Sequence, residues 1–333
     1  MTVDLKTVSL EPLRHAYDHL ERRFGPKPAT RYQEGSYDIQ AVENLHYRPT
    51  WDPDQTLYDP TLSRVRMADW YTIKDPRQYY YTTYTLARSR QQDTAEANFS
   101  FVESRGLAEM LTDDLRAQAL AMLVPLRHAA WGANQNNTLI CAYGYGATFT
   151  QPCMFQAMDN LGIAQYLSRL GLLLGDVDAL EDGKRAWQDG ARWQGLRRYV
   201  EDTMALRDPV EVFVAQNLVL DGLLYPLVYE RLVDDVLSAR GGACVAMLTQ
   251  FMSDWAVETR KWVDATIKTL AAEPATAEAD NAAVLREWID CWLPRAAEAL
   301  QPVVAIVLDE QAAEAVDEQR SALLARIAKA GLR

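Results

Sequence analysis

Apolar residues recur at spacings of three and four along nearly the whole 333-residue chain, and this periodicity predicts packed α-helices. The clearest example is the segment "CMFQAMDNLGIAQYLSRLGLLLGD", residues 153–176, whose inward stripe reads Asn160, Ile163, Leu167, Leu170 and Leu174. Runs that alternate apolar and polar residues, as half-buried strands do, are absent from the sequence. The chain is therefore predicted to be all-α. Its stripe also poses a question, because it begins with an amide that has up to four hydrogen bonds to place.

Capping residues divide the helical pattern into elements. Asp75 is expected to cap the first helix of the body, Thr112 a second, and Asp208 a long helix that reaches Ser238. A Gly-Gly break then separates this helix from another over residues 243–271. Long helices joined by short breaks favour antiparallel pairs and hence a bundle.

The sequence divides into three predicted parts. Residues 1–73 form an N-terminal helix and an extended arm, residues 74–271 form the helical bundle, and residues 272–333 form a C-terminal helical extension. The stretch "PATAEADNAA" is the expected linker into this last part.

The arm, residues 28–73, has neither a helical nor a strand period, and it carries Asp-Pro pairs and many aromatic residues. So many aromatic side chains are costly to leave in water, which favours an extended segment that lies on another surface. The predicted partner-binding residues are Tyr47, Trp51, Tyr58, Trp70 and Tyr71. The alternative is that the arm folds back over its own bundle.

The composition restricts the possible partners and compartments. A net charge of −12 without a basic cluster argues against nucleic acid and against anionic membrane surfaces. The absence of a twenty-residue apolar run and of a signal-peptide pattern predicts a cytoplasmic protein. The cysteines lie far apart with apolar neighbours, so we expect buried free thiols at Cys141, Cys153, Cys244 and Cys291.

A helical bundle of this size can hold a di-iron centre, which takes a Glu from each of two helices and Glu-x-x-His from each of the other two. The chain has four histidines and a single Glu-x-x-His, at Glu43 and His46. This match lies in the proline-rich arm and has no second copy, so chance explains it better than a metal site. No Gly-x-Ser-x-Gly nucleophile motif occurs either.

Four stretches, "HYRPTWDP", "MADWYTIKDPRQYYYTTY", "RHAAWGANQNN" and "FQAMDNLGIAQYLSRLGLLL", closely resemble the β subunit of the hydroxylase component of bacterial multicomponent monooxygenases, in the phenol hydroxylase branch. The likeness extends over nearly the whole chain. It implies a ferritin-like, ribonucleotide-reductase-like helical bundle without metal ligands. In that family a homologous α subunit holds the di-iron centre.

The resemblance also assigns the positions where the α subunits carry Asp-Glu-x-x-His. Asn160 and Ile163 stand in the Glu and His places of the first such helix, and Trp255 and Glu258 in those of the second. The remaining Glu positions fall near Ala130 or Trp131 and near Asp221. A neutral amide and an aliphatic side chain cannot hold two irons, and Trp255 is expected to fill the space that the metals leave.

The family likeness thus implies a non-catalytic structural subunit that has no cofactor of its own. Its expected partners are the di-iron α subunit and a small γ subunit in an (αβγ)₂ complex that hydroxylates phenols with O₂ and electrons from NADH. A regulatory protein and a reductase would bind transiently.

Two other hypotheses stay open. An autonomous ferritin-like di-iron protein would have to use Glu43, His46, Asp221 and Glu258, which are few ligands without a repeated spacing. The second hypothesis is a free-standing binding module. The aromatic arm is compatible with this hypothesis, but the apolar core argues against it.

Overall fold

The computed structural model of the chain describes residues 16–41, 48, 53–54, 56–276 and 279–332. Regular structure in these ranges is helical without any strand, which confirms the predicted all-α fold. The elements up to the middle of the chain are α1 (Asp18–Phe24), α2 (Arg31–Glu34), the 3₁₀ turn η1 (Trp70–Thr72), α3 (Tyr81–Ser104), α4 (Asp113–Leu123), α5 (Leu126–Tyr143) and α6 (Ala147–Asp189). They are followed by η2 (Ala191–Trp193), α7 (Gln194–Met204), α8 (Pro209–Phe213), η3 (Val214–Leu220), α9 (Asp221–Tyr225), η4 (Pro226–Gly242), α10 (Ala243–Ala271), α11 (Asn281–Leu308), η5 (Asp309–Gln311) and α12 (Ala312–Lys329).

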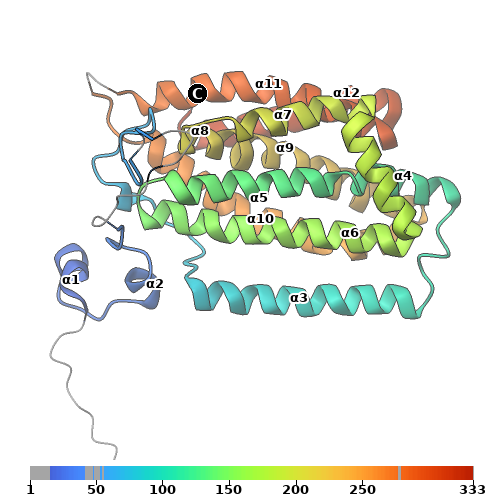
Figure 1. Cartoon of the computed structure of the whole chain (residues 1–333), viewed down its shortest axis with the longest axis horizontal. Helices are drawn as coiled ribbons and strands as arrows, with labels where there is room; N and C mark the ends of the chain where they lie inside the picture. The colour runs from blue at the N-terminus through green and yellow to red at the C-terminus, as the bar shows by residue number, and fades with distance from the viewer. Residues whose placement is uncertain (1–15, 42–47, 49–52, 55, 277–278, 333) are drawn as a thin grey trace, which may run out of the picture.

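The bundle is built from two helical pairs. One pair is α5 with α6, and the other is the continuous segment from α8 to η4 with α10. Figure 1 shows α5, α6, α9 and α10 running side by side, with α3 along one side and α7, α11 and α12 along the other. This is the ferritin-like arrangement that the sequence resemblance implied.

The inward stripe of residues 153–176 is confirmed. Asn160, Ile163, Leu167, Leu170 and Leu174 are at most 1% exposed. Helix α6 extends beyond the predicted segment to Asp189, with a kink at Gly175 and Asp176, where Asp176 has a φ of 56°.

The predicted caps are confirmed at two of three positions. The Thr112 side chain accepts a hydrogen bond from the Leu115 N–H, and Asp208 accepts from Val210 and Glu211. The prediction for Asp75 is wrong, because α3 begins six residues later, at Tyr81. The Asp75 carboxylate is fully buried and is instead held by the guanidinium of Arg77, at 3.0 Å.

The second helical pair has an unusual winding. Val214–Leu220 and Pro226–Gly242 form π-helical turns, in which residues five apart lie over one another. Pro226 has no N–H to donate to the Gly222 carbonyl, and Gln319 of α12 donates to this oxygen instead, at 3.3 Å. The π turns also let Gln216 reach Asp221, five residues further along the chain.

The C-terminal helices pack on the same core as the bundle. In the described parts of the chain, one large hydrophobic cluster extends from Val65 and Trp70 through the bundle to residues of α11 and α12, among them Trp288, Leu300 and Leu323. The three-part division of the chain stays a prediction, but its last part shares its apolar core with the bundle.

The arm lies on its own chain over much of its described length. Backbone N–H groups of Arg64, Arg66 and Ala68 donate to the side chains of Asp208, Asn281 and Glu273, at 2.7 to 2.9 Å. Nearer the N-terminus, α1 and α2 enclose a small cluster that contains Leu20, Tyr32, Tyr37 and Tyr71. The segment is therefore not wholly extended, and the alternative that it folds back on the bundle holds for residues 63–73.

Two helical stretches are long and apolar enough to cross a membrane by length and composition. They are Pro209–Ala271 and Asn281–Lys329, whose most apolar windows are 94% and 44% buried inside the protein. Burial of the first window is what a core helix of the bundle requires.

Candidate functional site

Asn160 takes its hydrogen bond from its own helix. Its side chain is 0% exposed and the Nδ2 group donates to the backbone carbonyl of Gln156 at 2.9 Å. Within the described part of the chain, its Oδ1 atom has no partner. The amide that begins the inward stripe is therefore held by a local backbone oxygen and keeps one free acceptor in the core.

The residue before it, Asp159, is the centre of a buried charge network. Its carboxylate accepts from both nitrogens of a bidentate Arg88 at 2.7 and 2.8 Å, from the Tyr84 hydroxyl at 2.8 Å and from the Trp255 indole at 2.9 Å. Asp159 and Trp255 are 4% and 0% exposed. Trp255 thus fills the interior, as expected, and also donates to the carboxylate.

Glu258 is drawn into the same network. Its carboxylate pairs with Arg88 at 3.0 Å and lies 3.5 Å from Arg77, which in turn holds Asp75. Burial opposes the charge of the Arg88 guanidinium, yet the carboxylates of Asp159 and Glu258 raise its pKa above the ordinary value. We name Asp75, Arg77, Arg88, Asp159 and Glu258 the ion network.

The ion network does not suit a di-iron centre. The carboxylates of Asp159 and Glu258 are already paired with the Arg88 guanidinium, and the Trp255 ring contributes an N–H donor rather than a lone pair. Among the residues described, no group of three or more His, Cys, Asp or Glu side chains is placed to hold a metal ion. Glu43 and His46, which the autonomous di-iron hypothesis requires, lie outside the described residues.

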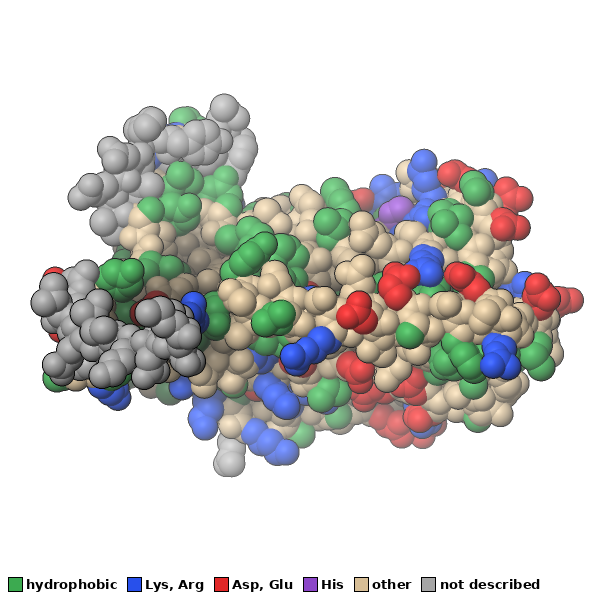
Figure 2. All heavy atoms as spheres, turned by 90° about the horizontal axis from the view of Figure 1, so that it is seen from below, with side chains coloured by type: hydrophobic (Ala, Val, Ile, Leu, Met, Phe, Trp, Pro, Cys, Tyr) green, Lys and Arg blue, Asp and Glu red, His purple; other side chains and the backbone are tan. Residues whose placement is uncertain are grey.

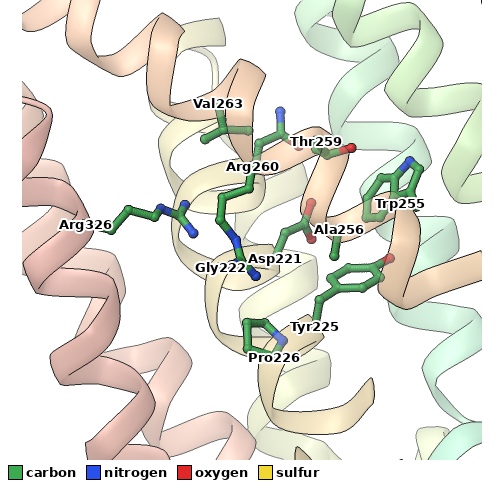
Figure 3. A pocket seen from close by; sticks show the side chains of 11 residues that line it. Asp221, Gly222, Tyr225, Pro226, Trp255, Ala256, Thr259, Arg260, Val263 and Arg326 are labelled. Carbon is green, nitrogen blue, oxygen red and sulfur yellow. The ribbon is translucent and has the colours of Figure 1, made fainter. Parts of the chain in front are cut away.

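Asp221 is the first residue of α9, lies apart from these charges and lines a cavity together with residues of α10. Its Oδ1 atom accepts from the Gln216 amide at 2.8 Å, and the Gln156 amide faces the same carboxylate. Burial raises the pKa of Asp221 from 3.8 to about 7, and the two amides limit the increase. Figure 3 shows Asp221 with the rings of Tyr225 and Trp255 to one side and Arg326 reaching in from α12 on the other.

Several positions that the resemblance aligns with the ligands of the α subunits line two small cavities. The first cavity has a volume of about 10 Å³ and is lined by Ala130, Asn160, Ile163 and Asp221, among others. The second cavity has a volume of about 20 Å³, and its lining includes Asp221 and Trp255. Each has room for about one water molecule, whose bonds would satisfy the free Oδ1 of Asn160 and Oδ2 of Asp221.

Of the two candidate positions on α5, the structure favours Ala130. Ala130 is 7% exposed and faces the first cavity, whereas Trp131 is 51% exposed and points outward. Glu258 lines neither cavity, because its carboxylate is turned towards Arg88.

Sequence reasoning missed Arg88, Gln156 and Gln216 altogether. The sequence did draw attention to Asp159, because this residue stands in the Asp place of the Asp-Glu-x-x-His pattern in which Asn160 stands in the Glu place. The sequence gave no such indication for Arg88, because it is one of two arginines on the polar helix α3 and it binds Asp159, which lies 71 residues further along the chain.

The predicted partner-binding residues divide into three groups. Tyr47 and Trp51 lie outside the described residues. Trp70 and Tyr71 are 5% and 7% exposed and pack within the chain's own clusters, so little of either ring is open to a partner, and their role stays a prediction. Tyr58 is half-buried, and its role stays a prediction.

The cysteines are free thiols, as expected. Cys153 and Cys244 are buried and Cys141 is half-buried. Cys291 is exposed, which corrects the prediction for that position, because it lies on the outer face of α11.

The fold is thus a ferritin-like bundle of the class that includes the di-iron carboxylate proteins, and the positions that the resemblance aligns with their ligands carry an amide, aliphatic groups and a tryptophan. More narrowly, the chain belongs to the methane/phenol/alkene hydroxylase family, whose model matches residues 51–274. This finding confirms the resemblance to the phenol hydroxylase branch.

The relatives agree on this family. The oxygenase component DmpL of phenol 2-monooxygenase from Pseudomonas sp. (strain CF600) is 50% identical, over 100% of this chain and 99% of its own. A xenon-pressurized phenol hydroxylase from Pseudomonas sp. OX1 contains a chain of the same fold, with a TM-score of 0.90, 44% identity and 98% coverage of both chains. The hydroxylase component subunit beta of toluene-4-monooxygenase from Ectopseudomonas mendocina is 24% identical, over 88% of this chain and 94% of its own.

Replacement of Asn160 by leucine is expected to change the free energy of unfolding by less than about 1 kcal/mol. The amide serves one carbonyl, that of Gln156, which also accepts the i+4 backbone N–H of the helix, so no buried group is stranded. Urea titration of the two proteins measures the difference. A loss above about 2 kcal/mol would show that the free acceptor of Asn160 has a bound partner.

Proposed function

We propose that this chain is the non-catalytic, structural β subunit of a phenol hydroxylase-type multicomponent monooxygenase. In this role it supports a partner subunit that holds the di-iron centre and hydroxylates phenols or related aromatics with O₂. The chain itself binds no cofactor and forms no active site.

The observation that carries the proposal is what fills the ligand positions. Asn160, Ile163 and Trp255 supply no anionic ligand, and Glu258 is committed to Arg88. An enzyme that had merely lost its ligands would keep a solvated pocket at this place, whereas here the two cavities have room for about one water molecule each and the charges of the ion network are paired. A scaffolding role fits a bundle that is stabilised in this way.

The relatives support the assembly. The matched proteins are described as an oxygenase component and as the beta subunit of a hydroxylase component, so further subunits are expected for this chain. We propose an (αβγ)₂ complex with a di-iron α subunit and a small γ subunit, located in the cytoplasm. Electrons derived from NADH would arrive through a reductase that, like the regulatory protein, binds transiently.

Iron analysis tests this function. The complex is purified through a tag on this chain, its subunits are separated under non-denaturing conditions, and iron is measured in each. We expect iron with the partner subunit and no stoichiometric iron with this chain. Two irons per copy of this chain would contradict the proposal and favour the autonomous di-iron protein.

A further inference from the structure

A pocket of about 290 Å³ lies where three helices meet, namely the start of α5, the last turns of α6 and α7. This is the end of the bundle near α4 in Figure 1, and at the same end Figure 2 shows a histidine among basic, acidic and hydrophobic side chains. The pocket shares no lining residue with the two cavities at Asp221. Ligand pockets run from roughly 300 to 1,000 Å³, so this one suits a ligand with a single ring.

Two glycines let these helices approach one another closely. A Cβ atom on Gly132 of α5 would lie 2.3 Å from Cγ1 of Val200 on α7. A Cβ atom on Gly183 of α6 would lie 2.5 Å from Cγ1 of Val124, which precedes α5. Carbon atoms in contact are about 3.5 to 4.0 Å apart, so a side chain at either position would push the helices away from each other. The residue before the first glycine and the residue after the second both line the pocket.

Aromatic side chains form much of the wall. The ring of Trp187 on α6 is stacked on His128 of α5, with 5.7 Å between the ring centroids. Trp131 on α5 also lines the pocket and is 51% exposed. Val200 and Met204 of α7 add apolar surface. A flat apolar ligand in this pocket would cover indole surface that now contacts water.

The charge around the pocket is positive and incompletely paired. Arg197 is committed to Glu201, at 2.7 Å, whereas the exposed Lys184 has no ion-pair partner among the residues described. Burial and the neighbouring cations Arg127 and Lys184 lower the pKa of His128 from 6.5 to about 4, so its imidazole is neutral at pH 7. A second cation is therefore disfavoured here, and an anionic group beside Lys184 is favoured.

We propose that this pocket binds a small aromatic carboxylate, with its ring against Trp131 and Trp187 and its carboxylate towards Lys184. A phenol has the same ring, but with an ordinary pKa near 10 it is uncharged at pH 7 and leaves the lysine without a counter-charge. A nucleotide exceeds the volume of the pocket, and its phosphates would call for several donors where the pocket offers one unpaired cation. The inference does not depend on the proposed function, because no residue of the pocket belongs to the ion network or to the positions aligned with metal ligands.

Titration of the full-length chain with three ligands at pH 7.5 tests the chemistry. Benzoate has both the flat ring and the charge, cyclohexanecarboxylate has the charge without a flat ring, and phenol has the ring without the charge. Ligand-observed NMR gives the three dissociation constants. We expect benzoate to bind at least about fivefold more tightly than either of the others.

Variants locate the binding. Lys184→Met alters an exposed side chain, so the protein should fold normally, and it should weaken benzoate about fivefold while the affinity for phenol stays the same. Trp131→Leu keeps an apolar side chain but removes the flat ring, so it should weaken both aromatic ligands. The matched control is Lys261→Met, at an exposed lysine of α10 that lies outside the pocket, and its affinities should equal those of the unmodified chain.

Four outcomes would overturn the proposal. The first is that benzoate does not bind. The second is equal binding of benzoate and cyclohexanecarboxylate without an effect of Trp131→Leu, which reduces the site to a surface lysine. The third is equal binding of benzoate and phenol without an effect of Lys184→Met. The fourth is that the complex purified through a tag on this chain shows no benzoate binding that depends on Lys184, because another subunit would then cover the pocket.

Discussion

Replacement of Arg88 by methionine is expected to lower the free energy of unfolding by about 3 to 5 kcal/mol. The guanidinium is bidentate to Asp159 and also pairs with Glu258, and its side chain is 12% exposed. Methionine keeps much of the volume and removes the charge, so the Asp159 carboxylate is left buried with two neutral donors, Tyr84 and Trp255. Denaturant unfolding followed by far-UV circular dichroism measures the loss.

Two further variants separate charge from packing. Arg88→Lys keeps the charge but cannot bind Asp159 through two parallel hydrogen bonds, so an intermediate loss is expected. Adding Asp159→Asn to Arg88→Met removes the stranded charge while the amide oxygen still accepts from Trp255, and the pair should be more stable than Arg88→Met by itself. If the double variant recovers nothing, the loss comes from packing and not from an unpaired carboxylate.

Replacement of Asp221 by asparagine is expected to stabilise the protein, with the gain increasing between pH 4 and pH 7. Burial raises the pKa of Asp221 from 3.8 to about 7, so the folded state favours the protonated acid. The stability that this group contributes is fully present below the pKa of the unfolded chain and is lost as the pH rises through about 7. The difference corresponds to roughly 4 kcal/mol at most above pH 8.

Asparagine is a suitable probe because its Oδ1 atom can still accept from Gln216 while the side chain no longer titrates. Asp221→Leu removes the same titration but strands the Gln216 amide, so at pH 4 it should be less stable than the unmodified protein by about 1 to 3 kcal/mol. Unfolding free energies measured at pH 4, 6 and 8 decide the matter. A gain from Asp221→Asn that is equal at all three values would show that the buried carboxyl does not titrate in this range.

The sequence predicted the helices well where the spacing of apolar residues along a helix shows which of its faces is buried. The inward stripe from Asn160 to Leu174 is buried as expected, and the helix predicted over residues 243–271 has those limits in the structure. Thr112 and Asp208 cap helices because the groups they bind lie two or three residues away.

Prediction failed where a local pattern competes with a distant partner. Asp75 precedes a proline, as capping residues often do, but its carboxylate serves a buried Arg77 instead. Trp70 and Tyr71 lie in a segment without periodicity, and nothing in that segment reveals that η1 packs on the bundle and on the small N-terminal cluster. Aromatic content predicted burial correctly but could not say against which surface.

The sequence by itself determined the helical class and the positions of the main helices, because helical hydrogen bonds, caps and stripes all join residues within about four positions of one another. Its resemblance to a known family also aligned Asn160, Ile163, Trp255 and Glu258 with the metal ligands of the α subunits, and this assignment stays a prediction. Only the tertiary structure decided which groups these side chains and their neighbours contact. Arg88 binds Asp159, which is 71 residues away in the sequence, and Glu258, which is 170 residues away. Gln216 donates to Asp221 across a π turn, and the spacing of residues in the sequence does not predict that turn. Buried charges need partners, but which partners they find depends on how the helices pack.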